Sequence, residues 1–142
     1  MKKDVLISIK GVYSVDDSKD VIEIFTTGHY YKRNGNYYIS YEESEATGYN
    51  GSRTTLKVEQ EARVTLNRSG LASSQLIVER GARHQCHYDA GYGDIMIGII
   101  GNRIKSSLDD SGGNLEIKYS LDVNALLASE NEMYIHIKEC AQ

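Results

Sequence analysis

Apolar and polar residues alternate along most of this chain. In residues 5–13 the odd positions, among them Val5, Ile9 and Tyr13, form one side of an extended chain. Residues 115–123 show the cleanest alternation, with an apolar residue at every odd position. A period of two is typical of a strand that has one face in a core and the other in water. The pattern therefore predicts β-structure.

Further extended segments follow one another, separated by turn signals. Asn34-Gly35 is the strongest hairpin signal, because both residues accept a positive φ. Residues 59–61 are either a turn or a bulge inside one long bent strand, and residues 124–128 are compatible with a single helical turn. The other expected strands are residues 20–32, 37–43, 54–60, 62–68, 76–80, 82–89, 95–108 and 133–138.

The number and spacing of these strands predict the fold class. Turn signals recur every ~8–14 residues, which is typical of an all-β sandwich or barrel, and no segment is long enough for a βαβ crossover. The chain has no proline, a residue that edge strands favour, and a closed barrel has no edges. Gly98 and Gly101 indicate bends within residues 95–108. We therefore expect one domain, residues 1–142, forming an antiparallel closed β-barrel of about 8–10 strands with at most one short helical turn.

Composition limits the partners and the cellular location that we expect for such a barrel. The chain has 142 residues, a formal net charge of −4 and two cysteines, Cys86 and Cys140. The negative charge gives no basic field for a phosphate backbone, so we expect no nucleic-acid partner. Residues 1–10 lack the continuous apolar region of a signal peptide, and no run reaches the roughly 18–20 apolar residues of a membrane span. We therefore expect a soluble, cytoplasmic protein with free thiols.

Three stretches of the chain together resemble a known family. They are Arg68-Ser69-Gly70, the segment from Arg83-His84-Gln85 through Tyr88 to residues 91–93, and the segment from 113–121 to 129–133. They resemble the YwiB-like family of small bacterial proteins, a domain of unknown function with a calycin (lipocalin-like) barrel. Asp89-Ala90 stands where the family has a threonine-like position. The resemblance implies the barrel and implies no activity.

His84, Cys86 and His87 form a His-x-Cys-His motif. On a strand, His84 and Cys86 share a face, while His87 points to the other face and cannot exchange a proton with the thiol. A third ligand from His29 or His136 would complete a zinc site. We favour the simpler interpretation of a hydrogen-bonded histidine beside a small buried thiol. Because the sequence holds no second ligand pair, we expect no metal and no cofactor.

The stretch around Arg83 is the strongest candidate for ligand binding. An arginine in a barrel can bind a carboxylate or phosphate with two hydrogen bonds, and tyrosines offer both a ring and a hydroxyl to an amphipathic ligand. For each residue taken singly, the alternative is an ion-paired structural arginine or a tyrosine packed in the core. The predicted ligand-binding residues are Arg68, Arg83, His84, Gln85, Tyr88 and Tyr92.

Three functional hypotheses follow from these observations. The first is a barrel that holds a small amphipathic or anionic molecule. The alternative is a non-catalytic structural or interaction protein with a filled barrel, acting through its outer surface as a homodimer. The least favoured is a hydrolase-type or zinc enzyme that uses His84 and Cys86, and we expect a protein that is not an enzyme.

Overall fold

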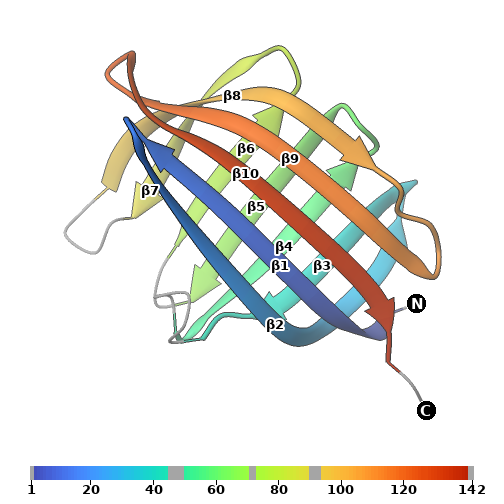
Figure 1. Cartoon of the computed structure of the whole chain (residues 1–142). Helices are drawn as coiled ribbons and strands as arrows, with labels where there is room; N and C mark the ends of the chain where they lie inside the picture. The colour runs from blue at the N-terminus through green and yellow to red at the C-terminus, as the bar shows by residue number, and fades with distance from the viewer. Residues whose placement is uncertain (1, 45–49, 71–72, 90–93, 141–142) are drawn as a thin grey trace.

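The computed structural model describes residues 2–44, 50–70, 73–89 and 94–140 and forms a closed barrel of antiparallel strands (Figure 1). Each strand pairs with its neighbours in sequence, and β1 pairs with β10 to complete the ring. The strands are β1 (Lys3–Val15), β2 (Ser18–Arg33), β3 (Asn36–Glu42), β4 (Ser52–Glu59), β5 (Arg63–Gly70), β6 (Ser74–Glu79), β7 (Arg83–Asp89), β8 (Asp94–Ser106), β9 (Gly112–Val123) and β10 (Leu126–Glu139). The predicted fold class, an antiparallel barrel, is thus confirmed.

Two connections that the sequence left open are turns. β4 and β5 are separate strands joined at Gln60, which has a φ of 56°. Asn124 and Ala125, with φ values of 54° and 64°, connect β9 to β10 directly, so residues 124–128 contain no helical turn. Two successive residues with positive φ match the twist of a tight hairpin, which explains why the strands continue up to this turn. The Asn34-Gly35 hairpin is confirmed, with φ values of 53° and 81°.

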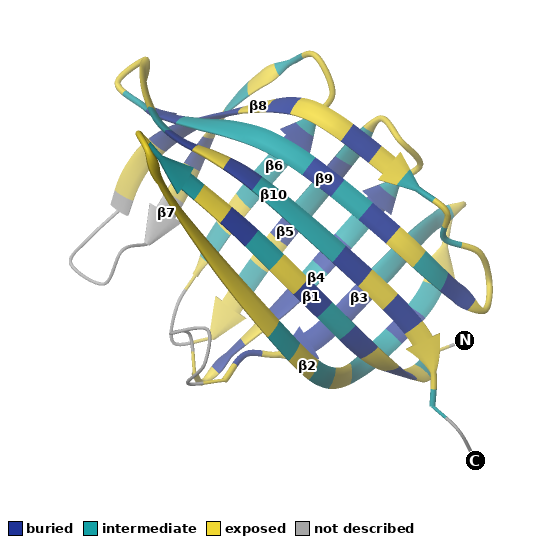
Figure 2. Cartoon of the chain, viewed as in Figure 1, coloured by how far each residue is buried: buried dark blue, intermediate teal, exposed yellow. Residues whose placement is uncertain are grey.

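Buried and more exposed residues alternate along the strands (Figure 2), and the buried side chains fill the barrel interior. The core consists almost wholly of aliphatic side chains, with Ile39 and Ile99 fully enclosed. Burying one such side chain contributes roughly 1.5–3 kcal/mol, so this packing is the main source of stability. We call the interior the lumen and the side chains that alternate with the core residues outward-facing.

One end of the barrel, which we call the far end, is covered by the loop between β8 and β9. Tyr30 of β2 donates a 2.7 Å hydrogen bond to the Asp109 carbonyl, and Tyr37 of β3 donates one of 2.7 Å to Asp110 Oδ1. Leu108 packs against the core. Because β2 and β3 are not neighbours of β8 or β9 in the ring, these bonds draw the loop across the opening. Burial and the bond to Asp110 raise the pKa of Tyr37 to about 12.

We call the opposite end of the barrel the mouth. It carries the β1–β2 and β9–β10 hairpins, while the two chain termini lie at the far end (Figure 1). β2 pairs with β1 from Ser18 to Tyr30, but its described pairing with β3 begins only at Gly28. The preceding half of β2 is largely exposed (Figure 2). Among the described residues, 18–27 of β2 have no partner on the β3 side, and we call this unpaired edge of β2 the gap.

Candidate functional site

Strand β7 does not bring the predicted ligand-binding residues onto one face. Cys86 belongs to the core, so His84 shares its face while Arg83 and Gln85 face outward. Gln85 is exposed and pairs through its backbone with Gly98 of β8. The predicted cluster is therefore divided between the lumen side and the outer surface.

Arg83 forms an ion pair on the outer surface. Its Nε and Nη2 donate hydrogen bonds of 3.0 and 2.7 Å to the two carboxylate oxygens of Asp122 in β9. The guanidinium spans β8 at Gly98, where a Cβ atom would collide with it. These hydrogen bonds lower the pKa of Asp122 and raise that of Arg83. In this structure, Arg83 ties β7 to β9 across the outer face.

His84 and Cys86 each have a partner close by in the fold. His84 Nε2 lies 3.0 Å from Glu79 Oε1, and Cys86 Sγ accepts a 3.4 Å hydrogen bond from the Ile77 amide. Burial raises the pKa of the Cys86 thiol, which makes it a poor nucleophile. Within the described residues, no three His, Cys, Asp or Glu side chains gather as a metal site would require.

The described structure includes the backbone of one of the two predicted tyrosines and not the other. The backbone of Tyr88 lies in β7 opposite Ser74 of β6. Tyr92 and the Gly91–Gly93 corner lie outside the described residues. Cross-strand pairs also place Ser74 opposite Arg68, so the positions of Arg68 and Tyr88 share one level of the barrel.

Arg68 points into the lumen and meets a buried carboxylate there. Its Nε and Nη2 lie 3.4 and 3.3 Å from Oε2 of Glu43, and the Thr54 hydroxyl donates to the same oxygen. The side chains of Arg68 and Glu43 are only 10% and 1% exposed. We call Glu43, Thr54 and Arg68 the lumen cluster. It is a charged site inside a barrel whose core is mostly hydrocarbon, with Ser52, Ser129 and Asn131 as further buried polar residues.

The second carboxylate oxygen of Glu43 distinguishes this cluster from an ordinary ion pair. Oε1 is buried and has no hydrogen-bond partner among the residues that the structure describes. Burial and then the nearby Glu43 charge raise the pKa of Tyr41, so its hydroxyl stays protonated and is close enough to hydrogen-bond with Glu43 and Thr54. A buried acceptor without a donor is uncommon, because the lost hydration is not replaced.

Local sequence explains how the three residues of the lumen cluster reach the same place. Each lies two residues from a core position and therefore faces the same side of the sheet as that core residue. The pairs are Tyr41 with Glu43, Leu56 with Thr54, and Leu66 with Arg68. A backbone hydrogen bond of 2.8 Å from Glu43 to Ser52 extends the β3–β4 ladder past the end of β3. Sequence reasoning identified Arg68 and missed Glu43 and Thr54. Polar residues at lumen-facing positions were the available signal.

Apolar residues of β2 border the gap on the lumen side. Ile24 pairs with the core residue Ile9, and Ile22 shares its face. Ile22 is 53% exposed, because β3 does not extend along this half of β2. Continuing the β2–β3 register two residues past the Gly28–Tyr41 pair would place Thr26 across from Glu43. The mouth thus combines an aliphatic wall with the lumen cluster.

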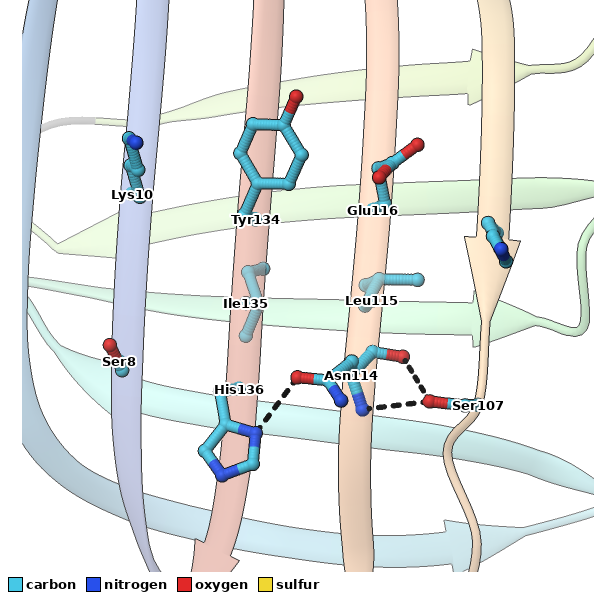
Figure 3. A pocket seen from close by; sticks show the side chains of 10 residues that line it. Ser8, Lys10, Ser107, Asn114, Leu115, Glu116, Tyr134, Ile135 and His136 are labelled. Carbon is cyan, nitrogen blue, oxygen red and sulfur yellow. Dashed lines mark hydrogen bonds between the residues drawn. The ribbon is translucent and has the colours of Figure 1, made fainter.

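A hollow lies on the outer surface over β1, β10, β9 and the end of β8 (Figure 3). It has a volume of about 520 Å³. A 2.8 Å hydrogen bond joins His136 Nδ1 and Asn114 Oδ1, and the Asn114 amide donates to the Ser107 hydroxyl. Glu116 pairs with Arg103. Because these groups bind one another, we regard the lumen cluster as the better candidate site.

Comparison with known proteins identifies the family. The family described as a domain of unknown function, DUF1934, matches residues 7–135. The chain belongs to this family. The predicted resemblance is therefore confirmed, and the match spans the barrel from β1 into β10.

A relative and a solved structure from Bacillus subtilis agree with this assignment. The chain is 30% identical to the uncharacterized beta-barrel protein YwiB of strain 168 over 119 residues, or 84% of this chain and 82% of the relative. The crystal structure of ywiB protein superimposes with a TM-score of 0.87 at 26% identity and covers 99% of this chain and 94% of that one. Family and fold are established, and neither description names a ligand or an activity. No helix able to cross a membrane occurs in the described part of the chain.

Proposed function

We propose that this protein binds one small amphipathic molecule at the mouth of the barrel. The supporting observation is the charged lumen cluster inside a hydrocarbon core. A buried ion pair gains little net stability over apolar side chains of the same size, because desolvation offsets the attraction. Arg68 and Glu43 therefore have a better rationale as recognition groups than as stabilising ones.

The apolar surroundings of the lumen cluster support a ligand that has an apolar part as well as a polar group. Ile22 and Ile24 line the lumen side of the gap, and the middle of the barrel is already filled by core side chains. A ligand would place its polar group at the lumen cluster and its apolar part against β2. Ligand sites in proteins commonly combine an apolar lining with a few fixed polar groups.

A fluorescence titration with Nile red, an uncharged amphipathic dye, tests this proposal. Ile22 and Val21 are successive residues of β2 with exposed fractions of 53% and 51%, and they face the lumen and the outside respectively. We expect saturable binding, weakened about tenfold by Ile22→Asp because the dye would then bury a carboxylate. The matched control Val21→Asp should bind the dye with the same affinity as the wild type. Equal effects of the two changes, or no saturable binding, would contradict the proposal.

A second candidate function is protein interaction through the outer face of β1 and β2. Phe25 is 77% exposed and lies with Leu6 along one shallow apolar hollow. Two copies of the chain meeting on this patch would form a homodimer. Size-exclusion chromatography with light scattering tests it: the protein should run as a dimer, and Phe25→Ser should yield monomers. A wild-type monomer at high concentration would remove this candidate.

We also propose that the protein works in the cytoplasm. Cys86 and Cys140 are both free thiols, which suits a reducing compartment.

A further inference from the structure

We propose that the outer surface of the barrel carries a separate site for the phosphate group of a small molecule. The site is a hollow with a volume of about 340 Å³, lined by Glu61, Arg80, Asn102, Arg103, Ile104 and Lys105. We call it the basic hollow. It lies toward the far end, where the β4–β5 and β6–β7 turns meet the second half of β8. It is thus distinct from the ligand site proposed at the mouth.

Backbone contacts hold the β6–β7 turn against β8. The Gly81 amide donates a 3.0 Å hydrogen bond to the Gly101 carbonyl. The Arg80 amide donates one of 3.0 Å to the Ala62 carbonyl, which ties the turn to the β4–β5 connection as well. A Cβ at Gly101 would lie 2.4 Å from the Glu79 carbonyl oxygen, so this close approach needs the glycine. The backbone that carries Arg80 is therefore fixed beside β8.

A β-bulge in β8 brings Arg103 to the same place. The register between β8 and β9 shifts between Gly101 and Arg103, and Asn102 and Arg103 are both exposed. Bulges change the direction of side chains and are frequent next to functional sites. Arg80 forms a β-bridge with Gly101, two positions before Arg103. The bulge and the bridge together place the two arginines on one hollow.

Positive charge exceeds negative charge in the basic hollow. Three cations, Arg80, Arg103 and Lys105, line it together with one carboxylate, Glu61. Glu61 Oε2 already accepts a 2.9 Å hydrogen bond from the Ser106 amide. Among the described residues, neither Arg80 nor Lys105 has an ion-pair partner. On a chain whose net charge is −4, this local excess of cations favours an anionic ligand.

Two acidic side chains beside the basic hollow already have partners. Glu116 of β9 accepts a hydrogen bond from Nε of Arg103. A guanidinium has five N–H donors, so the terminal nitrogens of Arg103 remain for another acceptor. Glu79, next to Arg80 in the chain, lies 3.6 Å from Nη1 of Arg63. These carboxylates therefore leave most of the positive charge of the hollow available.

A phosphate group matches these donors better than a carboxylate does. A phosphate monoester carries close to two negative charges at neutral pH and three strong acceptor oxygens. A guanidinium can bind two of these oxygens at once, and an ammonium adds a point charge. The volume of the basic hollow leaves room for an organic group beside the phosphate. Lys105 also lines the neighbouring hollow over β9 and β10, into which that group would extend.

An amide NMR titration of isotope-labelled protein at pH 7 and constant ionic strength tests the proposal with inorganic phosphate and phenyl phosphate. The signals of Arg80, Arg103 and Lys105 should shift saturably. Arg80→Met should weaken binding about tenfold, because charge-assisted hydrogen bonds are lost. The matched control Arg33→Met removes an exposed arginine of β2 that does not line the hollow, and it should bind phosphate as the wild type does.

Each outcome of the titration decides for or against the basic hollow. No saturable shift at these residues, or equal weakening by Arg80→Met and Arg33→Met, would overturn the proposal. Lys105→Met should also weaken binding, and it decides the matter if Arg80→Met does not fold. Tighter binding of phenyl phosphate would identify a phosphorylated molecule as the ligand, and tighter binding of inorganic phosphate would identify free phosphate; both support the site.

Discussion

Arg68 and Arg53 pair with adjacent glutamates on opposite faces of the same part of the sheet. Arg68 binds Glu43 in the lumen, where the two side chains are 10% and 1% exposed. Arg53 binds Glu42 on the outside, where the values are 45% and 67%. Two ion pairs of similar composition therefore differ mainly in their access to water.

This difference predicts unequal effects of the same substitution. Arg68→Met leaves a buried carboxylate unpaired and should lower the free energy of unfolding by roughly 3–5 kcal/mol. The control Arg53→Met should change it by no more than about 1 kcal/mol, because exposed pairs are screened by water. Urea denaturation measures both. Similar losses in the two variants would show that Glu43 is not enclosed as described.

The Arg83–Asp122 ion pair predicts that the stability of the protein depends on pH in the acidic range. The hydrogen bonds from Arg83 lower the pKa of Asp122 below the usual value of about 3.9. The resulting stabilisation is complete above about pH 4 and is lost as the pH falls through the lowered pKa of the folded state. Arg83→Met should therefore be less stable than wild type at neutral pH, and the difference should shrink below pH 4.

Denaturation midpoints between pH 2 and 7 would measure this effect. Gln85→Met, which changes an uncharged neighbour on the same outward face of β7, is the control and should show no such convergence. A wild-type-to-variant difference that stays constant down to pH 2 would contradict the assigned role of the Arg83–Asp122 pair.

At the scale of the element, Gly28 marks where β2 leaves β3. A Cβ at this position would meet the Ser40 carbonyl oxygen and lie 2.7 Å from Ile7 Cδ1. A Cβ at Gly11 of β1 would have no atom within 4 Å. Gly28→Ala should therefore lower the free energy of unfolding by about 1–3 kcal/mol through overpacking. Gly11→Ala should be neutral or slightly stabilising, since alanine is less flexible in the unfolded chain. Equal thermal denaturation curves for the two variants would contradict the close packing at Gly28.

The elements themselves could largely be predicted from the sequence, because alternation and turn residues are local properties. The period of two located the strands, and Asn34-Gly35 located a hairpin. The Asn124-Ala125 turn escaped because alanine seldom adopts a positive φ, so it gives no turn signal. The point at which β2 leaves β3 depends on packing around Gly28, which no local pattern records.

The candidate site could be predicted only in part for the same reason. Local sequence placed Arg83, His84 and Gln85 side by side, and the alternation of β7 then separated their faces. Arg68 and Glu43 are 25 positions apart and meet only through the registers of β3, β4 and β5. A cluster assembled from three strands by two strand pairings has no signature in any single stretch.

At the scale of the whole molecule, the described residues at the two ends of the barrel differ. Hydrogen bonds from Tyr30 and Tyr37 hold the 107–111 loop across the far end, where Leu108 joins the core. The mouth keeps the gap beside β2 and the lumen cluster. The lumen cluster and the unpaired edge of β2, both in the described part of the chain, are the basis for proposing a ligand at the mouth of a barrel whose middle is filled.

The most direct test of this account is a methyl NMR titration of isoleucine-labelled protein with Nile red. Ile22 and Ile24 lie on the lumen side of β2 at the mouth, whereas Ile100 faces outward on β8. The account predicts saturable shifts of the Ile22 and Ile24 methyl signals and none for Ile100. Shifts confined to Ile100 and other outward-facing methyls, or no saturable shift at any methyl, would contradict a ligand site at the mouth.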